Sequence, residues 1–306
     1  MKELIKRNHD VRIFDIKSTK NRKVAKKYED KVEIIWGDIR NFEDVEKAVS
    51  GQEVVIHLAA IIPPLADKQP KFAEEVNVGG TTNIIKAMEN QSQKPRLIFT
   101  SSISIYGDRL ESPFIKISDP PNPNPHDDYA KQKLKCENLI KNSSLKWAIF
   151  RLTGIFSPNK LQRDPLMFDM PLETCLEICH TKDVGLALVN AIENQEIWDD
   201  IFNIAGGIKC RIIYKDFLAK MLGLFGLGFH YLPEEAFSKR GFHCGFVDTN
   251  KSQKLLQYQR HTLTDFFNEV KKKVKVIRFL STLFRPIARR YLLGKSPYYK
   301  AKRKQD

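Results

Sequence analysis

The feature that most constrains the fold is a regular alternation of short apolar runs with segments of helical periodicity. The apolar runs before residue 153 comprise residues 11–15, 32–36, 53–58, 96–100 and 147–152. Short apolar runs joined by helices are typical of βαβ units, in which crossover helices connect parallel strands. The pattern therefore predicts an α/β fold with a doubly wound parallel sheet. The most apolar early run, residues 53–58, is expected to be a central strand.

The segments between these runs have a clear local character. Residues 41–49 have helical periodicity with Asn41 as the expected N-cap, and residues 78–90 form a further expected helix. Residues 129–141 read as a long amphipathic helix. Residues 118–126 contain four prolines and are expected to be irregular, because proline lacks a backbone N–H.

The alternation loosens after residue 153, which suggests how the chain is divided. We expect residues 1–153 to form the main α/β domain. Residues 154–270 are expected to supply the rest of the sheet together with a small substrate lobe. Residues 271–306 are expected to form a basic amphipathic tail.

The net charge of +14 is concentrated in this tail. Residues 271–306 contain 13 Lys and Arg against one acidic residue, whereas the first 270 residues contain 38 basic and 36 acidic residues. The body is therefore nearly neutral, and the tail carries whatever affinity the chain has for an anionic partner. No nucleic-acid-binding signature accompanies the charge, so nucleic acid is not an expected partner.

The tail combines apolar side chains at helical spacing with interleaved arginines over residues 274–293. Pro286 is expected to kink or divide this helix. One interpretation is an interfacial helix on an anionic membrane surface, and the other is a helix docked on the body with a solvated charged face. We expect a cytoplasmic protein, with peripheral association at the inner face of the membrane left open.

Five cysteines are scattered along the chain and are expected to be reduced thiols. Cys175 and Cys179 form the one cluster, together with His180. Their spacing is not a zinc pattern and no second pair follows, so no metal site is predicted.

Tyr129 and Lys133 are the first residues that suggest chemistry. Residues four apart lie on one face of a helix, so the phenol and the ammonium group can address one site. A free phenol has a pKa near 10, so it needs a neighbouring cation to act as an acid or base near neutrality. The pattern also occurs on ordinary solvated helices, and this alternative stays open at this point.

A serine-rich segment follows the apolar run at 96–100. Residues 99–107 read Phe-Thr-Ser-Ser-Ile-Ser-Ile-Tyr-Gly and lie about 25 residues before Tyr129. Strand ends in parallel sheets face the ligand crevice, so a serine there can hold a substrate oxygen against the phenol. The alternative is a plain turn rich in Ser and Thr.

Together with Val-Val-Ile-His-Leu-Ala-Ala at residues 54–60, these two segments resemble the extended short-chain dehydrogenase/reductase family, which includes NAD-dependent epimerases and dehydratases. Further matches follow in family order at Asp15, Gly37, Asp38, 77–83, 151–154, 180–184, 202–207 and 247–251. The resemblance covers roughly residues 1–270. It implies a Rossmann-like, NAD(P)-binding domain over residues 1–153.

The resemblance implies a role for each matching residue. Tyr129 is the implied general acid/base, Lys133 lowers its pKa and binds the nicotinamide ribose, and Ser102 orients the reacting oxygen. Ser102 is preferred among the serines because it lies four residues before Tyr106, as in the family. The implied cofactor-binding residues are Asp15, Asp38, Ile39, Leu58, Ala59, Ala60 and Asn77, together with Tyr129 and Lys133.

The implied cofactor is NAD. Asp15 would bind the adenosine ribose hydroxyls, and its charge would repel a 2′-phosphate. Lys17 and Lys20 lie nearby and leave NADP open. Asp38 would face the adenine. Asn77 would stabilise the strand ends at the active site, or would simply cap a helix.

The sequence departs from the family at its start. Residues 1–10 already read as the end of the first family helix, and the first strand with its GxxGxxG loop is absent. We interpret this as a fragment or a truncation. Those glycines let backbone N–H groups approach the cofactor pyrophosphate, so weak NAD binding is expected. The strands at 11–15 and 32–36 are also expected not to reach the strand at 53–58.

The implied reaction is hydride transfer at a secondary alcohol, by an epimerase, dehydratase or dehydrogenase, with a nucleotide sugar as the main candidate substrate. Only 25 residues separate Gly154 from His180, which is short for a nucleotide-sugar site. Oxidation of a sterol-like alcohol, as in 3-beta-hydroxysteroid dehydrogenases, is one alternative. A non-catalytic relic or binding protein, or a cofactor-binding regulator of the atypical branch, is another. Family analogy suggests a homodimer.

Overall fold

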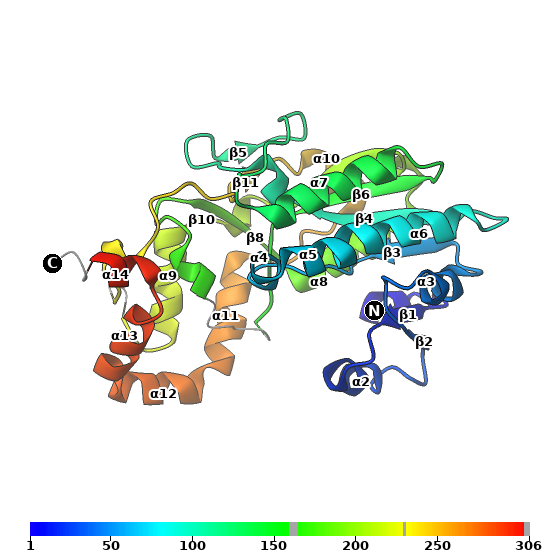
Figure 1. The fold of residues 1–306 in the computed structure, drawn as a ribbon. Helices are drawn as coiled ribbons and strands as arrows, with labels where there is room; N and C mark the ends of the chain where they lie inside the picture. The colour runs from blue at the N-terminus through cyan, green and yellow to red at the C-terminus, as the bar shows by residue number, and fades with distance from the viewer. Residues whose placement is uncertain (159–164, 229–230, 303–306) are drawn as a thin grey trace.

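The computed structural model describes residues 1–158, 165–228 and 231–302, and its largest sheet has four parallel strands (Figure 1). In spatial order they are β3 (Val54–His57), β4 (Arg96–Ser102), β6 (Trp147–Leu152) and β9 (Asp200–Ile204). The connections between them are crossovers through helices, as the alternation in the sequence predicts. The predicted α/β class with a Rossmann-like parallel sheet is confirmed.

The first two strands stand apart from this sheet. β1 (Arg12–Asp15) and β2 (Glu33–Trp36) pair in parallel only with each other. Within the described residues no strand lies between β1 and β3, so the expected separation of the two parts is confirmed. The prediction of a central strand at 53–58 is wrong, because β3 forms an edge while β4 and β6 pair on both sides.

Helices cover both faces of the four-stranded sheet. One layer contains α3 (Phe42–Val49), α6 (Gly80–Glu89) and α7 (Asp128–Lys141), and the other contains α8 (Thr181–Glu193) and α10 (Asn250–Leu256). Leu97 and Phe99 of β4 pack with the first layer, whereas Ile98 packs with the second. Successive strand residues point to opposite faces, so a strand covered on both sides is apolar throughout.

Two short helices accompany the N-terminal strands. α1 (Lys2–Lys6) packs against α8, and Arg7 at its end forms an ion pair with Glu193 at 2.9 Å. α2 (Thr19–Ala25) connects β1 to β2. Asn41 caps α3 as predicted, since its side chain accepts a hydrogen bond from the backbone N–H of Asp44.

The helix expected at 78–90 begins earlier. α4 (Leu65–Lys68) is followed by α5 (Pro70–Glu74), a π-helical turn (Glu75–Gly79) and α6 in close succession. Pro70 fits the first turn of α5, where a missing N–H costs nothing. Asn77 therefore lies inside a helical run, and its interpretation as a simple helix cap is wrong.

A second lobe follows the sheet and has its own core. In its sheet, β8 (Cys175–His180) pairs antiparallel with β10 (Arg211–Ile213) and parallel with β7 (Gly154–Phe156). Separately, β5 (Phe114–Ile115) pairs with β11 (Phe246–Val247). α9 (Tyr214–Leu224) and α11 (Leu263–Lys273) pack around Phe217 and Phe266. Residues 118–126 contain neither helix nor strand, as predicted.

Three helices end the chain, and they lie at one end of the molecule (Figure 1). They are α12 (Lys275–Leu283), α13 (Arg285–Leu293) and α14 (Pro297–Lys302). Pro286 occupies the first turn of α13 and so divides the predicted helix. Residues 303–306 of the predicted tail lie outside the described residues. None of the described helices is long and apolar enough to cross a membrane.

Candidate active site

Ser102 and the first turn of α7 lie at the carboxyl edge of the four-stranded sheet. Ser102 ends β4, and its hydroxyl accepts a hydrogen bond from the backbone N–H of Ser104 at 3.1 Å. Asp127 caps α7 by accepting a hydrogen bond from the N–H of Ala130 at 2.8 Å. This cap places Tyr129 in the first turn of the helix.

Lys133 lies one turn further along α7 and is buried. Its ammonium group donates a hydrogen bond to the carbonyl of Thr100 at 2.7 Å. The same nitrogen lies 4.6 Å from the ring centroid of Phe99 and 5.8 Å from that of Tyr129. Burial lowers the pKa of Lys133 to about 8, because desolvation disfavours the charged form.

The phenol of Tyr129 is half-buried beside these groups. Burial raises its pKa above the usual value, the Asp127 carboxylate raises it further, and a hydrogen bond with Ser102 acts in the opposite direction. The sequence predicted a lowered pKa through Lys133. In this structure burial outweighs any such effect, so Tyr129 is protonated near neutrality and can donate a proton.

A buried polar network supports this site, and sequence reasoning missed it. Glu137 of α7 accepts hydrogen bonds from the guanidinium of Arg151 at 2.7 and 3.0 Å and from the Ser101 hydroxyl at 2.6 Å. Arg151 also donates to the Tyr106 hydroxyl at 2.7 Å, which in turn donates to Asn203. The network ties α7 to β4, β6 and β9. The sequence feature that could have indicated this network is Glu137, because it lies four residues after Lys133 and so on the same helix face.

Asn77 joins the end of β3 to α7. Its side chain accepts a hydrogen bond from the N–H of Ile61 at 2.7 Å and donates one to the carbonyl of Ile61 at 2.9 Å. It also donates to Gln132, which is buried on α7, at 2.7 Å. Of the two roles the sequence left open for Asn77, the contacts agree with stabilisation of the strand end.

The other predicted cofactor-binding residues follow the ends of β1, β2 and β3. Asp15 is exposed, with one carboxylate oxygen accepting a hydrogen bond from the N–H of Ile16 at 2.8 Å. Leu58 is 60% exposed, Ala59 is exposed, and Ala60 is half-buried.

Asp38 and Ile39 have partners within the protein. Asp38 forms hydrogen bonds with the guanidinium of Arg40, the shortest at 2.6 Å, and these hold the pKa of its carboxyl below the usual value. The Ile39 side chain is buried against α6, where a Cβ at Gly80 would lie 2.7 Å from it. Ile39 is therefore a core residue, and only its backbone can face a bound molecule.

These residues fit the two ends of an NAD molecule. The exposed Asp15 carboxylate suits ribose hydroxyls, and the exposed apolar surface of Ile16, Leu58 and Ile62 suits the rings. The Lys133 ammonium has no carboxylate within ion-pair distance among the described residues, so it is available to a ribose hydroxyl. For the pyrophosphate, the described residues contain no glycine-rich turn that leads from a strand into a helix.

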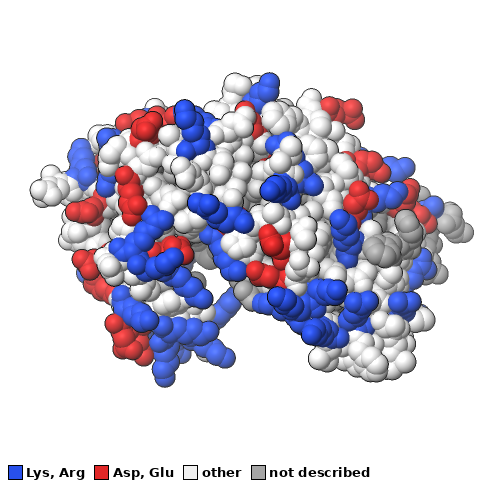
Figure 2. Space-filling model, turned by 180° about the vertical axis from the view of Figure 1, so that it is seen from behind, with Lys and Arg blue, Asp and Glu red and all other residues white. Residues whose placement is uncertain are grey.

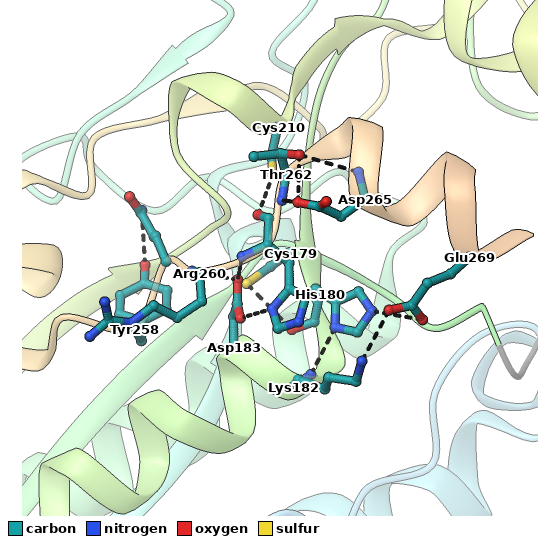
Figure 3. Close-up of polar contacts among 12 residues, drawn as sticks. Cys179, His180, Lys182, Asp183, Cys210, Tyr258, Arg260, Thr262, Asp265 and Glu269 are labelled. Carbon is teal, nitrogen blue, oxygen red and sulfur yellow. Dashed lines mark hydrogen bonds and ion pairs between the residues drawn. The ribbon is translucent and has the colours of Figure 1, made fainter.

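A second polar cluster connects α8 to α11 (Figure 3). Asp183 accepts a hydrogen bond from the ring Nδ1 of His261 at 2.5 Å, and the rings of His261 and His180 stack with centroids 4.4 Å apart. Glu269 of α11 lies 3.8 Å from His180 and 3.0 Å from Lys182. Burial, and then His261, lower the pKa of His180. The cluster holds the second lobe to the helix layer.

The cysteines next to this cluster do not form a metal centre with it. Cys179 is buried and directs its thiol towards the carbonyl of His180, while Cys175 is half-buried. Within the described residues no group of three or more His, Cys, Asp or Glu side chains could hold a metal ion.

Known proteins resemble this chain in sequence over its first half and in fold over most of its length. Residues 1–149 match the model of the 3-beta hydroxysteroid dehydrogenase/isomerase family. This match to the first part of the chain agrees with the resemblance to the extended short-chain dehydrogenases/reductases that the sequence motifs indicate. Mouse 3 beta-hydroxysteroid dehydrogenase type 7 is 32% identical over 111 residues, which are 36% of this chain and 30% of the mouse protein.

An epimerase and a solved structure align over greater lengths. Vibrio cholerae UDP-glucose 4-epimerase is 35% identical over 131 residues, which are 40% of this chain and 39% of the epimerase. The chain thus spans well under half the length of these curated relatives. The structure of UDP-glucuronic acid 4-epimerase from Bacillus cereus in complex with NAD superimposes with a TM-score of 0.71. It is 20% identical and covers 90% of this chain and 94% of that chain, which shows a shared fold.

Proposed function

We propose that the chain is an NAD-dependent enzyme that transfers hydride at a secondary alcohol carbon. The observation that carries the proposal is the group formed by Ser102, Tyr129 and Lys133. Tyr129 and Ser102 are hydrogen-bonded, and the Lys133 ammonium lies 5.8 Å from the phenol ring. A phenol, a hydroxyl and a buried cation at one strand end are what proton transfer to and from an alcohol oxygen requires.

Each residue has a proposed part in the reaction. The Ser102 hydroxyl orients the substrate oxygen, and the Tyr129 phenol exchanges a proton with that oxygen. Lys133 is proposed to bind the nicotinamide ribose, and its positive charge favours the phenolate when Tyr129 must accept a proton. Bound NAD would supply the ring that takes up the hydride. Asp15, Asp38, Leu58, Ala59, Ala60 and the backbone of Ile39 are proposed to line its site, and Asn77 to brace it.

The proposed substrate is a nucleotide sugar or a similar polyol. It is suggested by a similar sequence, the UDP-glucose 4-epimerase of Vibrio cholerae, and by a similar fold, the UDP-glucuronic acid 4-epimerase of Bacillus cereus. A second candidate is oxidation of a 3-beta-hydroxysteroid or a similar apolar alcohol. It is favoured by the family model that matches residues 1–149 and by the mouse relative.

The wider organisation belongs to the same proposal. Residues 1–153 would bind the cofactor, residues 154–270 would complete the sheet and supply the substrate lobe, and the active unit would be a homodimer. NAD is proposed over NADP because the exposed Asp15 carboxylate would repel a 2′-phosphate. The proposed membrane contact of residues 271–306 concerns another part of the molecule and is independent of this site.

The test separates cofactor binding from chemistry. Fluorescence titration of the full chain with NADH and NADPH measures binding first. The chain is then incubated with NAD and either UDP-glucose, UDP-glucuronic acid or a 3-beta-hydroxysteroid. Accumulation of NADH with the steroid identifies a dehydrogenase, whereas a new sugar epimer without net NADH identifies an epimerase. If the folded chain binds neither dinucleotide, the proposal fails and a non-catalytic binding protein becomes the better reading.

A further inference from the structure

The helices α12 and α13 present their apolar side chains to solvent. No residue of α12 is buried, and Val276, Phe279 and Leu283 are 74%, 72% and 65% exposed. Leu280, Phe284, Ile287 and Tyr291 are exposed as well. An amphipathic helix of a globular protein normally turns its apolar face to the core, so this arrangement is the reverse of the usual one.

Polar contacts hold these helices to the body. Thr282 and Arg285 donate hydrogen bonds to the carbonyl of Gly226 at 3.2 and 2.7 Å. Arg289 donates to the carbonyl of Tyr231 at 2.8 Å. Buried Val274 before α12 and buried Leu293 at the end of α13 belong to the core of the second lobe. Both ends of the pair are thus anchored, and the apolar side chains between them point away from the core.

Positive charge surrounds this apolar surface. Residues 271–302 contain eleven Lys and Arg and no acidic residue. Lys271, Lys272, Lys275 and Arg278 are exposed and have no carboxylate within ion-pair distance among the described residues. In Figure 2 this end of the molecule lies at the lower right, where uncharged atoms border a group of Lys and Arg.

We propose that α12 and α13 form an interfacial anchor that binds the surface of an anionic lipid bilayer. Each helix has nine residues and is too short to span a membrane, so the pair would lie in the plane of the interface. Its apolar side chains would enter the boundary between headgroups and acyl chains, and the surrounding Lys and Arg would contact acidic headgroups.

Charge complementarity selects lipid over a second copy of this chain. The same surface on two copies would bring a strongly positive rim against an identical positive rim, which is unfavourable. An anionic bilayer instead offers both partners that the surface lacks, negative charge at the rim and an apolar phase for Phe279 and Leu283. Each basic residue near such a surface strengthens binding about fivefold.

The test is co-sedimentation of the full chain with vesicles of phosphatidylcholine, with and without phosphatidylserine. The chain is expected to sediment only with the phosphatidylserine vesicles and to be released by high salt. Phe279→Ser with Leu283→Ser should abolish this binding. These two side chains make no buried contacts, so the variant is expected to fold. The matched control is Val24→Ser on α2, which removes a 53% exposed apolar residue from another basic helix and should bind as the parent does.

A second readout reports insertion directly. Phe279→Trp is expected to shift its fluorescence to shorter wavelength when phosphatidylserine vesicles are added, because the ring leaves water. Unchanged binding by the double serine variant, or equal binding to pure phosphatidylcholine, would overturn the proposal. Self-association that the double serine variant abolishes, without any vesicle binding, would also overturn it and would identify a second copy as the occupant.

Discussion

Two helices of this protein, α7 and α12, reverse the usual distribution of side chains in opposite ways. α7 turns Lys133, Glu137 and Gln132 inward, where all three are buried. α12 turns Val276, Phe279 and Leu283 outward and buries nothing. α7 still buries the apolar residues Cys136 and Ile140 beside these polar ones, whereas α12 gains nothing from burying apolar surface.

The two helices differ in whether these side chains find contact partners within the protein. The polar groups of α7 find theirs within the fold, because Thr100, Ser101 and Arg151 lie opposite them on β4 and β6. The apolar groups of α12 find none among the described residues. A buried polar face with satisfied hydrogen bonds marks a site built within the protein, and an exposed apolar face marks one that an outside partner completes.

The largest effect is expected for Tyr129→Phe on α7. Loss of the phenolic proton should reduce turnover about 10²–10⁴-fold, the usual contribution of a positioned acid or base, with little change in stability. Steady-state rates measure it, with the candidate substrate on which the parent chain acts in the incubation test. Tyr291→Phe on α13 is the matched control, because that tyrosine is half exposed to solvent and should not affect turnover. Equal rates for both variants would remove Tyr129 from the chemistry.

Glu137→Gln tests whether the inward polar face of α7 is required for folding. It removes a fully buried carboxylate from Arg151, and breaking such a pair costs about 3–5 kcal/mol. Urea denaturation measures the free energy of unfolding. The control is Glu74→Gln. Glu74 forms an exposed ion pair with Lys135, which lies on α7 like Glu137, and this pair should contribute under about 1 kcal/mol to the free energy of unfolding. Similar small losses in both variants would show that the buried network is dispensable.

Stability should also depend on pH through His57, a buried residue at the end of β3. Burial and the charge of Lys133 lower the pKa of His57 from 6.5 to about 3. Between these values the unfolded chain binds more protons than the folded chain, so stability is lost as the pH falls below about 6.5. The slope should approach about 1.4 kcal/mol per pH unit for this group.

The measurement is the free energy of unfolding in urea at several pH values between about 4 and 7, where the protonation of His57 differs between the folded and unfolded chain. His57→Gln keeps a donor for the hydroxyl of Thr81, which accepts from His57 at 2.9 Å, but cannot titrate. Its stability should therefore depend less on pH than that of the parent. Parallel curves for parent and variant would assign the acid sensitivity to other groups.

The smallest effect is expected on α12. Phe279→Ser with Leu283→Ser should change the free energy of unfolding by less than about 0.5 kcal/mol, because exposed side chains contribute little to folding. Phe99→Ala in the core is the contrasting variant and should cost about 3–5 kcal/mol. Thermal unfolding of the three proteins measures both. A large loss in the serine variant would mean that α12 packs on the body after all.

Much of the fold could be predicted because its signals are local. Apolar runs identified β1, β2, β3, β4 and β6 to within two residues, and Asn41 identified the start of α3. The spacing of Tyr129 and Lys133 identified the helix that carries them. Apolar character alone wrongly indicated a central position for β3, because a strand's neighbours are set by pairings between distant segments; its edge position follows from the separation of β1 and β2, which the missing family strand predicted.

The proximity of the candidate site residues was predictable, but their electrostatics were not. Ser102, Tyr129 and Lys133 were named from motifs, and the structure brings them together. The raised pKa of Tyr129 was not foreseen, because it depends on burial and on the nearby Asp127. Nor was the role of Glu137 on α7 foreseen, because its partner Arg151 lies on β6.

The sequence by itself determined the order and type of the main elements before residue 153 and the concentration of charge in the tail. These depend on residue type and on spacing along the chain. Only the tertiary structure decided that Lys133 and Glu137 face inward and that Phe279 and Leu283 face outward. A helix can bury whichever face finds complementary partners, and those partners come from segments that are distant in sequence.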